Sequence, residues 1–282
     1  MSLSIRKYSK MMPRTRALYR YLNEEWSTFC EVCNSRWDGI APDLMKGRLT
    51  ESDVLGSGYF GIVLKTSDKR LVVKVTSDDE EGYFSQLVID NPALRDSEGL
   101  PYYFDVFAIP EWNAFVILRE DMTYGVFEND GKASPRLVSR MIERLDEFTD
   151  RVLQVDKQIA GLLRSLQEID SYRLSDGDVR MALREASGLI RIEVIKTISK
   201  FPKVSQSSKY FDLSQVVLKA LETYGIALSD LHPMNLGRHK HDISDLVPHL
   251  PKRSKSTVAL LDVGGNFGAP ILDKLIAQED VS

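Results

Sequence analysis

The stretch that decides the fold is Gly56-Ser57-Gly58-Tyr59-Phe60-Gly61-Ile62-Val63, followed after a short turn by Val72-Val73-Lys74-Val75. Its glycines allow backbone amides to approach phosphate oxygens closely, and an aromatic side chain at the loop tip can cover them. A dinucleotide-binding loop would lead directly into a helix, whereas the residues after Gly61 alternate as in a strand. The sequence therefore predicts two strands joined by a glycine-rich loop that covers a phosphate.

The composition is that of a folded globular protein. The chain has 282 residues, of which 43% are hydrophobic and 28% charged, so disordered, fibrous and collagen-like classes are excluded. The net charge of -4 predicts no general binding to nucleic acid. No apolar run reaches the roughly 18 residues of a membrane span, and residues 1–12 lack the apolar core of a secretory signal. These features predict a cytoplasmic protein with no membrane partner.

Apolar periodicity divides the chain into three parts. We expect a helical N-terminal extension over residues 1–50, a small antiparallel sheet over 51–122, and a mainly helical part over 123–282. In the second part, short apolar runs are separated by turn-forming residues, and a helix over 79–89 follows the third strand. The predicted fold class is α+β, with a sheet lobe and a helical lobe.

A heptad pattern runs through residues 135–172, where apolar residues recur at alternating spacings of three and four. One interpretation is a coiled-coil contact between two copies of the chain, which would make the protein a homodimer. The other is one long helix packed inside its own lobe, and we favour it because an amphipathic partner is predicted over residues 178–200.

Two further motifs carry polar groups suited to nucleotide chemistry. In Ser229-Asp230-Leu231-His232-Pro233-Met234-Asn235, a carboxylate and an amide lie five residues apart on one predicted loop. The carboxylate can orient a hydroxyl nucleophile, and the amide oxygen can bind a metal. Asp262 ends an apolar strand and precedes Val263-Gly264, where a carboxylate can hold Mg²⁺ against phosphates.

The ordered set of glycine-rich loop, strand lysine, Asp230-x-x-x-x-Asn235 and Asp262-Val263-Gly264 resembles the protein-kinase-like superfamily. The Asp-Leu-His-Pro-Met-Asn form is similar to compact phage-type Ser/Thr kinases and aminoglycoside-phosphotransferase-like kinases. The resemblance covers residues 55–268 and implies a bilobal fold with a β-sheet N-lobe containing one helix and a helical C-lobe.

The resemblance also implies ATP and Mg²⁺ as cofactors and a role for each matching residue. Lys74 would contact the α- and β-phosphates, Asp230 would be the catalytic base, and His232 would lie near the transferred phosphoryl group. Asn235 and Asp262 would bind Mg²⁺. The nucleotide would further be held by the glycine-rich loop, with Gly56, Gly58, Tyr59, Phe60, Gly61 and Val63, and by backbone groups of Glu120 and Met122 at the position of the hinge.

The acidic partner of Lys74 is left open by the sequence. Kinases place it on the helix after the lysine strand, where Glu80 lies on the apolar face by helical spacing. Ser77-x-x-Glu80 also fits a capping box, which leaves Glu81 as the alternative. Either carboxylate can also simply favour the start of the helix through the helix dipole.

The sequence departs from the kinase pattern in two places. Leu228 and Ser229 stand where many kinases have His and Arg or Gly, and 18 residues follow Gly264, so regulation by a phosphorylated activation segment is not expected. Between Asn235 and Asp262, residues 238–255 are rich in basic side chains. They can form a rim that attracts an acidic substrate, a metal patch with His239 and His241, or, as we favour, a solvated flexible hairpin.

These features predict a kinase that transfers the γ-phosphoryl group of ATP to a hydroxyl, most simply that of a protein Ser or Thr. Two alternatives stay open: a small-molecule kinase of the aminoglycoside-phosphotransferase type, and an inactive kinase-like binding module. The joint presence of Lys74, Asp230, Asn235 and Asp262 favours an enzyme, because a binding module needs neither a base nor two metal ligands.

Overall fold

The computed structural model describes residues 11–58, 60–124, 140, 143–144, 147, 203–224, 226–228, 231, 235–262 and 267–268. The described chain is a mixed α+β structure with an antiparallel sheet and several helices. It divides into two compact units, Met1–Val126 with Leu236–Gly264, and Phe127–Asn235 with Gly265–Ser282. The segment Leu236–Gly264 thus belongs to the same unit as the sheet strands, although more than 100 residues separate it from them in sequence.

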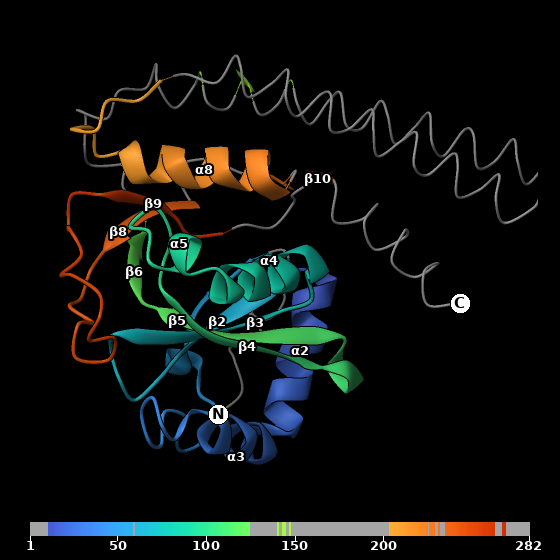
Figure 1. The fold of residues 1–282 in the computed structure, drawn as a ribbon. Helices are drawn as coiled ribbons and strands as arrows, with labels where there is room; N and C mark the ends of the chain where they lie inside the picture. Colours follow the sequence, from blue (N-terminus) through green and yellow to red (C-terminus); the bar gives the residue numbers. More distant parts are fainter. Residues whose placement is uncertain are drawn as a thin grey trace, which may run out of the picture. The chain divides into compact units, whose positions relative to one another are not determined.

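Five antiparallel strands form the main sheet of the first unit in the order β1-β2-β3-β5-β4 (Figure 1). The expected short apolar strands are confirmed, and the sheet consists of β1 (Val54–Ser57), β2 (Gly61–Lys65), β3 (Leu71–Thr76), β4 (Tyr103–Ile109) and β5 (Ala114–Glu120). Val63 of β2, Lys74 of β3 and Ile117 of β5 are opposite one another. Directly opposed residues share a face of the sheet, so these three side chains lie on the same side.

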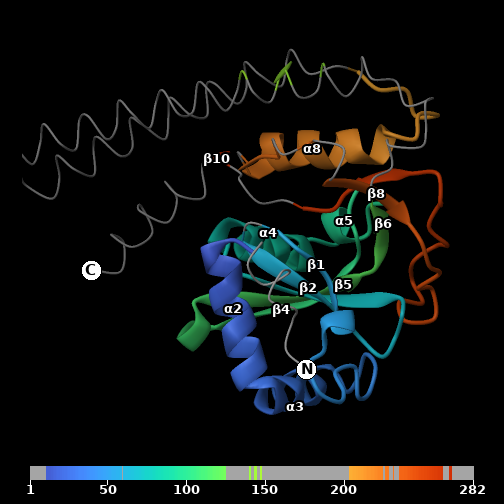
Figure 2. The ribbon, with the colours of Figure 1, turned by 180° about the vertical axis from the view of Figure 1, so that it is seen from behind.

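Helices cover both faces of this sheet. Helix α4 (Asp79–Asp90) lies on one side and α3 (Trp26–Trp37) on the other (Figures 1 and 2). The α3 side is closed by one apolar core that joins α2 (Pro13–Glu24), α3 and alternate strand residues such as Val73, Val75 and Leu118. Because strand side chains alternate between faces, the same alternation turns Lys74 towards α4.

From residue 11 onward, the N-terminal extension is described as two helices, where the sequence suggests one continuous helical stretch. Glu25 separates α2 from α3 with φ -111° and ψ 22°, and its N–H bonds to the carbonyl of Tyr21. Cys30 and Cys33 are both buried in α3 and unbridged, and burial raises the pKa of Cys30 to about 11. These two cysteines therefore act as small apolar core residues.

A second, three-stranded sheet of the first unit contains β6 (Met122–Tyr124), β8 (Leu236–His239) and β9 (Val258–Leu260), in the order β6-β8-β9. A short helix, α5 (Pro92–Arg95), follows α4, and 3-10 turns η1 (Glu51–Asp53) and η2 (Pro110–Trp112) precede β1 and β5. Through β8 and β9 the chain returns to the sheet unit just before Asp262.

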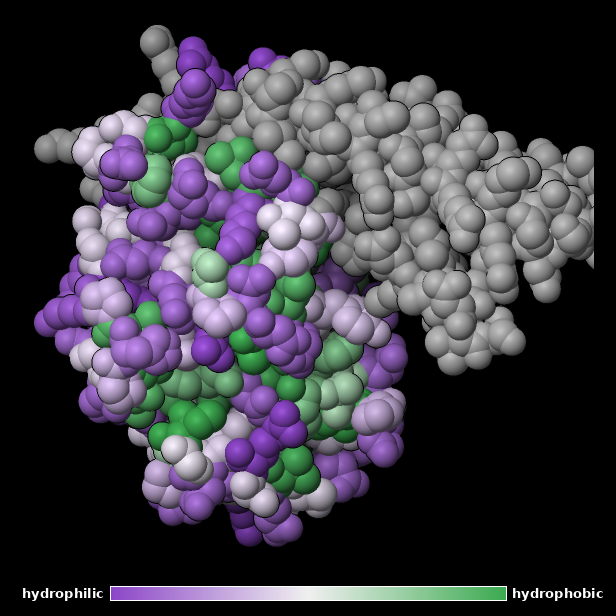
Figure 3. Space-filling view, in the orientation of Figure 1, coloured by the Kyte–Doolittle hydropathy of each residue, from purple (hydrophilic) through white to green (hydrophobic). Residues whose placement is uncertain are grey.

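The second unit is described by α8 (Phe211–Tyr224) and by β7 (Ile226–Ala227), which pairs antiparallel with β10 (Phe267–Gly268). The predicted helices over 135–172 and 178–200 lie outside the described residues, apart from 140, 143–144 and 147, which are helical. No helix within the described ranges is both long and apolar enough to cross a membrane. The face drawn in Figure 3 is mostly hydrophilic, with small separate apolar patches.

Candidate functional site

Lys74 is buried at the centre of an ionic group. Its Nζ lies 2.5 Å from Oε1 of Glu81 and 2.8 Å from Oδ2 of Asp262. These residues, called the Lys74 cluster below, come from β3, from α4 and from the chain just after β9. The fold thus brings together a strand lysine, a helix glutamate and an aspartate that is 188 residues away from the lysine in sequence.

Of the two acidic residues left open by the sequence, Glu81 is the partner of Lys74. The cap of α4 is Asp78, whose carboxylate accepts hydrogen bonds from the N–H groups of Glu80 and Glu81 at 3.0 and 3.4 Å. The expected capping box starting at Ser77 is therefore wrong. Successive helix residues point about 100° apart, so this position of the cap fixes which glutamate faces the sheet.

A glycine allows α4 to approach closely enough for this contact. A Cβ atom on Gly82 would overlap the ring of Phe115 on β5, so only glycine fits between helix and sheet. Glu81 and Ser85 are buried in the same interface, and the hydroxyl of Ser85 donates to the carbonyl of Glu81.

Asp262 is held in place through its neighbours. The N–H of Leu260 donates to the carbonyl of Gly99 at 2.9 Å, and the guanidinium of Arg119 donates to the carbonyl of Leu261. Arg119 is buried on β5, opposite Val72 and two residues from Ile117, so it lies on the same face as Lys74. The Asp262 side chain itself is 39% exposed, which leaves it accessible from solvent.

The charges of the cluster influence one another. Burial lowers the pKa of Lys74, but the adjacent carboxylates of Glu81 and Asp262 outweigh burial and raise it above its usual value. Burial raises the pKa of Glu81, against the opposing effect of Lys74. Lys74 therefore stays an ammonium, and Glu81 is a carboxylate that folding disfavours.

Tyr103 contributes a buried hydroxyl to the same region. Among the described residues, its oxygen has no hydrogen-bond partner, and it interacts electrostatically with Arg119, Glu81, Lys74 and Asp262. Burial raises the pKa of Tyr103 to about 12. Neither Tyr103 nor Arg119 was predicted as a site residue, although alternation along β5 from Ile117 would have placed Arg119 on the Lys74 face.

The glycine-rich loop lies at the turn between β1 and β2. The N–H of Gly58 donates to the carbonyl of Gly61, and a Cβ on Gly61 would come within 2.8 Å of the carbonyl oxygen of Val75 and 3.3 Å of Cε of Lys74. In contrast, a Cβ on Gly56 or Gly58 would come within 4 Å of no other part of the described chain. The loop is therefore tight where it meets Lys74 and open at its first two glycines.

The N-terminal helix holds this loop from one side. Thr15 of α2 donates its hydroxyl to the carbonyl of Gly58 at 2.8 Å, and the guanidinium of Arg14 lies 5.4 Å from the ring centre of Phe60. The carbonyl of Phe60 also accepts from the N–H of Ser77. Tyr59, predicted at the loop tip, lies outside the described residues.

Glu120 has a structural environment that the sequence did not predict. Its N–H, one of the backbone groups expected to hold the nucleotide, donates to the carbonyl of Tyr102 at 2.9 Å. This N–H is therefore already hydrogen-bonded within the protein. Its carboxylate lies 2.9 Å from Nδ1 of His239 and 3.4 Å from a guanidinium nitrogen of Arg253. Glu120, His239 and Arg253 form a second buried group, called the Glu120 cluster below. Met122 is buried in β6, opposite His239.

The basic segment over 238–255 is only in part the solvated hairpin favoured above, because Lys240, His249, Lys252 and Lys255 are exposed but two other basic residues are not. His239 and Arg253 are both buried, and they also contact the carbonyl groups of Glu98, Leu100 and Arg95. Desolvation is offset by these contacts with acceptors on the segments before β4 and on β5. Lys240 instead pairs with Asp121 at 2.8 Å near the surface.

The other predicted catalytic groups are not described together with the Lys74 cluster. Asp230 and His232 lie outside the described residues, and Asn235 is the last residue of its segment in the second unit. Within the described residues, no group of three or more His, Cys, Asp or Glu side chains is arranged to hold a metal ion. Among the residues that the structure describes, Asp262 and Glu81 are the carboxylates paired with Lys74.

A scan against protein-family models finds no match, and a search of curated proteins finds no significant relative.

Proposed function

We propose that the protein is an ATP- and Mg²⁺-dependent phosphotransferase of bilobal, protein-kinase-like fold that acts in the cytoplasm on a hydroxyl of a protein Ser or Thr. The observation that carries the proposal is the Lys74 cluster, in which a buried ammonium is held between Glu81 on α4 and Asp262 after β9. The glycine-rich turn between β1 and β2 lies beside the same lysine.

The chemistry of these residues fits a nucleotide triphosphate with its metal. An ammonium can bind phosphate oxygens, and a partly exposed carboxylate is the type of ligand that Mg²⁺ takes together with phosphates. Open space at the Cβ positions of Gly56 and Gly58 allows a ligand to approach the loop backbone. When bound, Mg-ATP supplies the transferable phosphoryl group and the charge of the metal.

The chain's own residues divide into those that position and those that react. Glu81 and Arg119 are positioning residues: the first orients Lys74, and the second fixes the carbonyl next to Asp262. In this proposal Lys74 binds phosphate oxygens, while Asp262 and Asn235 are the metal ligands. Asp230 accepts the proton of the attacking hydroxyl, and His232 lies beside the reacting groups.

The test is transfer of label from ATP. The protein is incubated with Mg²⁺ and ATP labelled at the γ-phosphate, with and without a lysate as a source of acceptors, beside Asp230→Ala and Asp262→Ala. We expect labelled protein in the lysate and a loss of about 100-fold or more in both variants, since each removes a group that acts on the reacting atoms. A parallel reaction with label at the α-phosphate reports adenylyl transfer.

Glu81→Gln and Glu80→Gln form a matched pair for the same assay, because the two residues are adjacent on α4 and only Glu81 contacts Lys74. We expect Glu81→Gln to lower the rate about tenfold or more, the size of a lost positioning contact, and Glu80→Gln to keep it. Absence of γ-label transfer together with no thermal shift by Mg-ATP would overturn the proposal. Label only on small molecules would redirect it to a small-molecule acceptor.

A further inference from the structure

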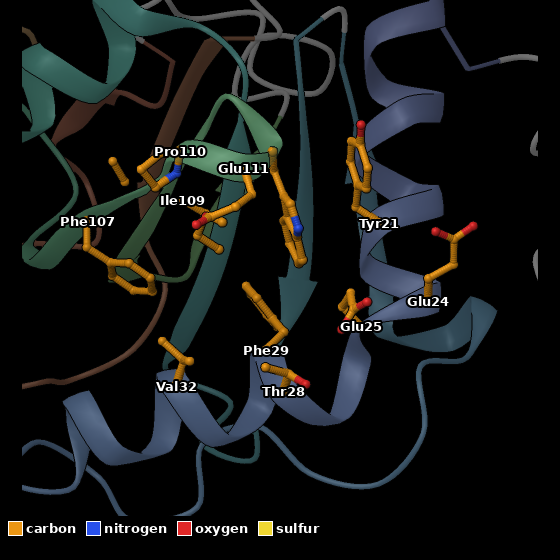
Figure 4. Close-up of a pocket in the computed structure, with 12 residues that line it drawn as sticks. Tyr21, Glu24, Glu25, Thr28, Phe29, Val32, Phe107, Ile109, Pro110 and Glu111 are labelled. Atoms are coloured by element: carbon orange, nitrogen blue, oxygen red, sulfur yellow. The ribbon is translucent and has the colours of Figure 1, made fainter.

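A surface cavity of about 590 Å³ lies on the sheet unit, away from the Lys74 cluster. It is lined by α2 and α3 on one side and by the end of β4 and η2 on the other (Figure 4). Its volume is in the range of pockets that hold ligands. None of the residues given a role in phosphoryl transfer lines it, so it needs its own explanation.

Aromatic rings form one wall of the cavity. The ring centres of Tyr21 and Trp112 are 5.9 Å apart with planes 10° from parallel, and those of Phe29 and Trp112 are 5.7 Å apart at 20°. In this stack Tyr21 and Trp112 are partly exposed, whereas Phe29 is buried, so the first two rings form the accessible aromatic surface of the cavity. The stack joins α2, α3 and the turn between β4 and β5.

Guanidinium groups of the chain itself already lie on the outer rings of this wall. The guanidinium carbon of Arg20 is 5.3 Å from the ring centre of Tyr21, and that of Arg36 is 5.1 Å from the ring centre of Phe107, a further lining residue. Both distances are within the reach of a cation–π contact. The aromatic surface is therefore of a kind that accepts arginine.

Three carboxylates line the same cavity. Glu24 and Glu25 come from the junction of α2 and α3, and Glu111 comes from η2 on the opposite side (Figure 4). All three are exposed, and none has a hydrogen bond or ion pair from its side chain to another of the described residues. Acidic groups beside partly exposed aromatic rings make the cavity complementary to a cation with an apolar or planar body.

We propose that this cavity binds a peptide segment of a partner protein that presents arginine next to apolar side chains. The planar guanidinium can stack on a ring and bond a carboxylate at the same time, which an ammonium does less well. The cavity lies open at the surface: Val32 at its edge is 46% exposed, and Ala108 and Pro110 are exposed too. A small-molecule site would enclose most of its ligand, whereas these apolar edges suit the residues flanking an arginine.

The test uses an eight-residue peptide that alternates arginine and leucine, and its counterpart with neutral citrulline in place of arginine. Both are titrated into the full-length protein by calorimetry without nucleotide, so the outcome is independent of the proposed phosphotransferase activity. We expect the arginine peptide to bind about tenfold more tightly than the citrulline peptide, and added salt to weaken it.

Two double variants with the same change in net charge locate the site. Glu25→Gln with Glu111→Gln removes two lining carboxylates, whereas Glu31→Gln with Asp38→Asn removes two exposed carboxylates in or just after α3 that do not line the cavity. We expect about a fivefold or greater loss of affinity in the first pair, equal to roughly 1 kcal/mol, and no change in the second.

Circular dichroism and the urea midpoint check that each variant is folded. Equal affinity for the two peptides, an equal loss in the two double variants, or no heat of binding up to about 1 mM peptide would each overturn the proposal.

Discussion

The Lys74 cluster and the Glu120 cluster are both buried ionic groups of the sheet unit, and both join the segment after residue 236 to the strands. They differ in how far their members are buried and paired within the protein. The Glu120 carboxylate accepts from the N–H of Tyr102 and from Arg253 and lies beside Nδ1 of His239, and the side chains of Glu120, Arg253 and His239 are all buried. The Lys74 cluster instead has a partly exposed Asp262. Each cluster also has a buried polar atom without a hydrogen-bond partner among the described residues, the Tyr103 hydroxyl beside Lys74 and Nε of Arg253 beside Glu120.

This difference indicates a structural role for the Glu120 cluster and a binding role for the Lys74 cluster. A buried charge is tolerated when the protein supplies its partners, and the Glu120 cluster meets that condition around its carboxylate. A buried cluster that leaves one member open to solvent and disfavours the charge of another is typical of a site that takes up a further group. We therefore expect the two clusters to respond in opposite ways to the same kind of substitution.

The largest effect is expected when the Glu120 cluster loses its arginine. Arg253→Met leaves the Glu120 carboxylate buried with fewer compensating charges, and we expect the free energy of unfolding to fall by about 3–5 kcal/mol. The urea midpoint measures this. Lys252→Met is the control, because Lys252 is exposed and pairs with Asp242 at the surface, and surface substitutions stay within about 0.5 kcal/mol. An equal fall in the free energy of unfolding of the two variants would show that Arg253 does not stabilise the fold through the Glu120 cluster.

A smaller loss is expected for the contact between β5 and the chain before Asp262. Arg119→Met removes the donor to the carbonyl of Leu261, and hydrogen bonds to charged groups contribute about 1.5–3 kcal/mol. We expect the free energy of unfolding in urea to fall by that amount, and amide hydrogen exchange at the N–H of Asp262 to become faster. Unchanged exchange there would show that Arg119 does not restrain this segment.

Within the Lys74 cluster, Glu81→Gln should change stability at pH 7 by less than about 1 kcal/mol. The variant keeps the shape and leaves Lys74 paired with Asp262, and it removes a carboxylate whose pKa is raised by burial. A group with a raised folded-state pKa contributes stability that is present below its unfolded pKa and is lost as the pH rises through its folded pKa. The free energy of unfolding of the wild type minus that of Glu81→Gln should thus be larger in acid than at neutral pH. Urea unfolding at several pH values between those limits measures this difference. The opposite slope would contradict a disfavoured Glu81 carboxylate.

The smallest effect at neutral pH is expected for Tyr103→Phe. Removing a buried hydroxyl that has no partner among the described residues should be neutral or slightly stabilising, by less than about 1 kcal/mol. At alkaline pH the two proteins should diverge. Burial raises the pKa of Tyr103 to about 12, so its contribution to stability is present below its usual pKa and is lost as the pH rises towards 12.

Urea unfolding at several alkaline pH values measures this divergence. Tyr83→Phe, at an exposed position of α4, serves as the control and should follow the wild type. A Tyr103→Phe curve that also follows the wild type would contradict a buried, un-ionised phenol.

Part of the site could be predicted because its signals are local. A valine-rich alternating run predicts that Lys74 lies on a strand, and the glycines before it predict a turn. The choice between Glu80 and Glu81 could not be made, because it depends on which residue caps α4. Asp78 and Ser77 are both good caps, and one residue of difference rotates every side chain by about 100°.

The roles of Glu120, His239 and Arg253 could not be predicted for another reason. A run of basic residues is usually solvated, and His239 and Arg253 are buried only because acceptors from Glu98, Leu100 and Arg95 and the carboxylate of Glu120 surround them. Those partners are more than 100 residues away from His239 and Arg253 in sequence, and no local sequence pattern predicts that they lie beside these residues.

Local sequence patterns suffice to predict the strands, the lysine on β3, the helix after it and the aspartate after an apolar strand, because periodicity and turn chemistry act over a few residues. Long-range packing is needed to bring Glu81 and Asp262 to Lys74, to place Arg119 on the same face of the sheet, and to bury Glu120 in a second cluster. Contacts of this kind depend on how the faces of separate elements pack, and burial then determines which charges are compensated and which stay open for chemistry.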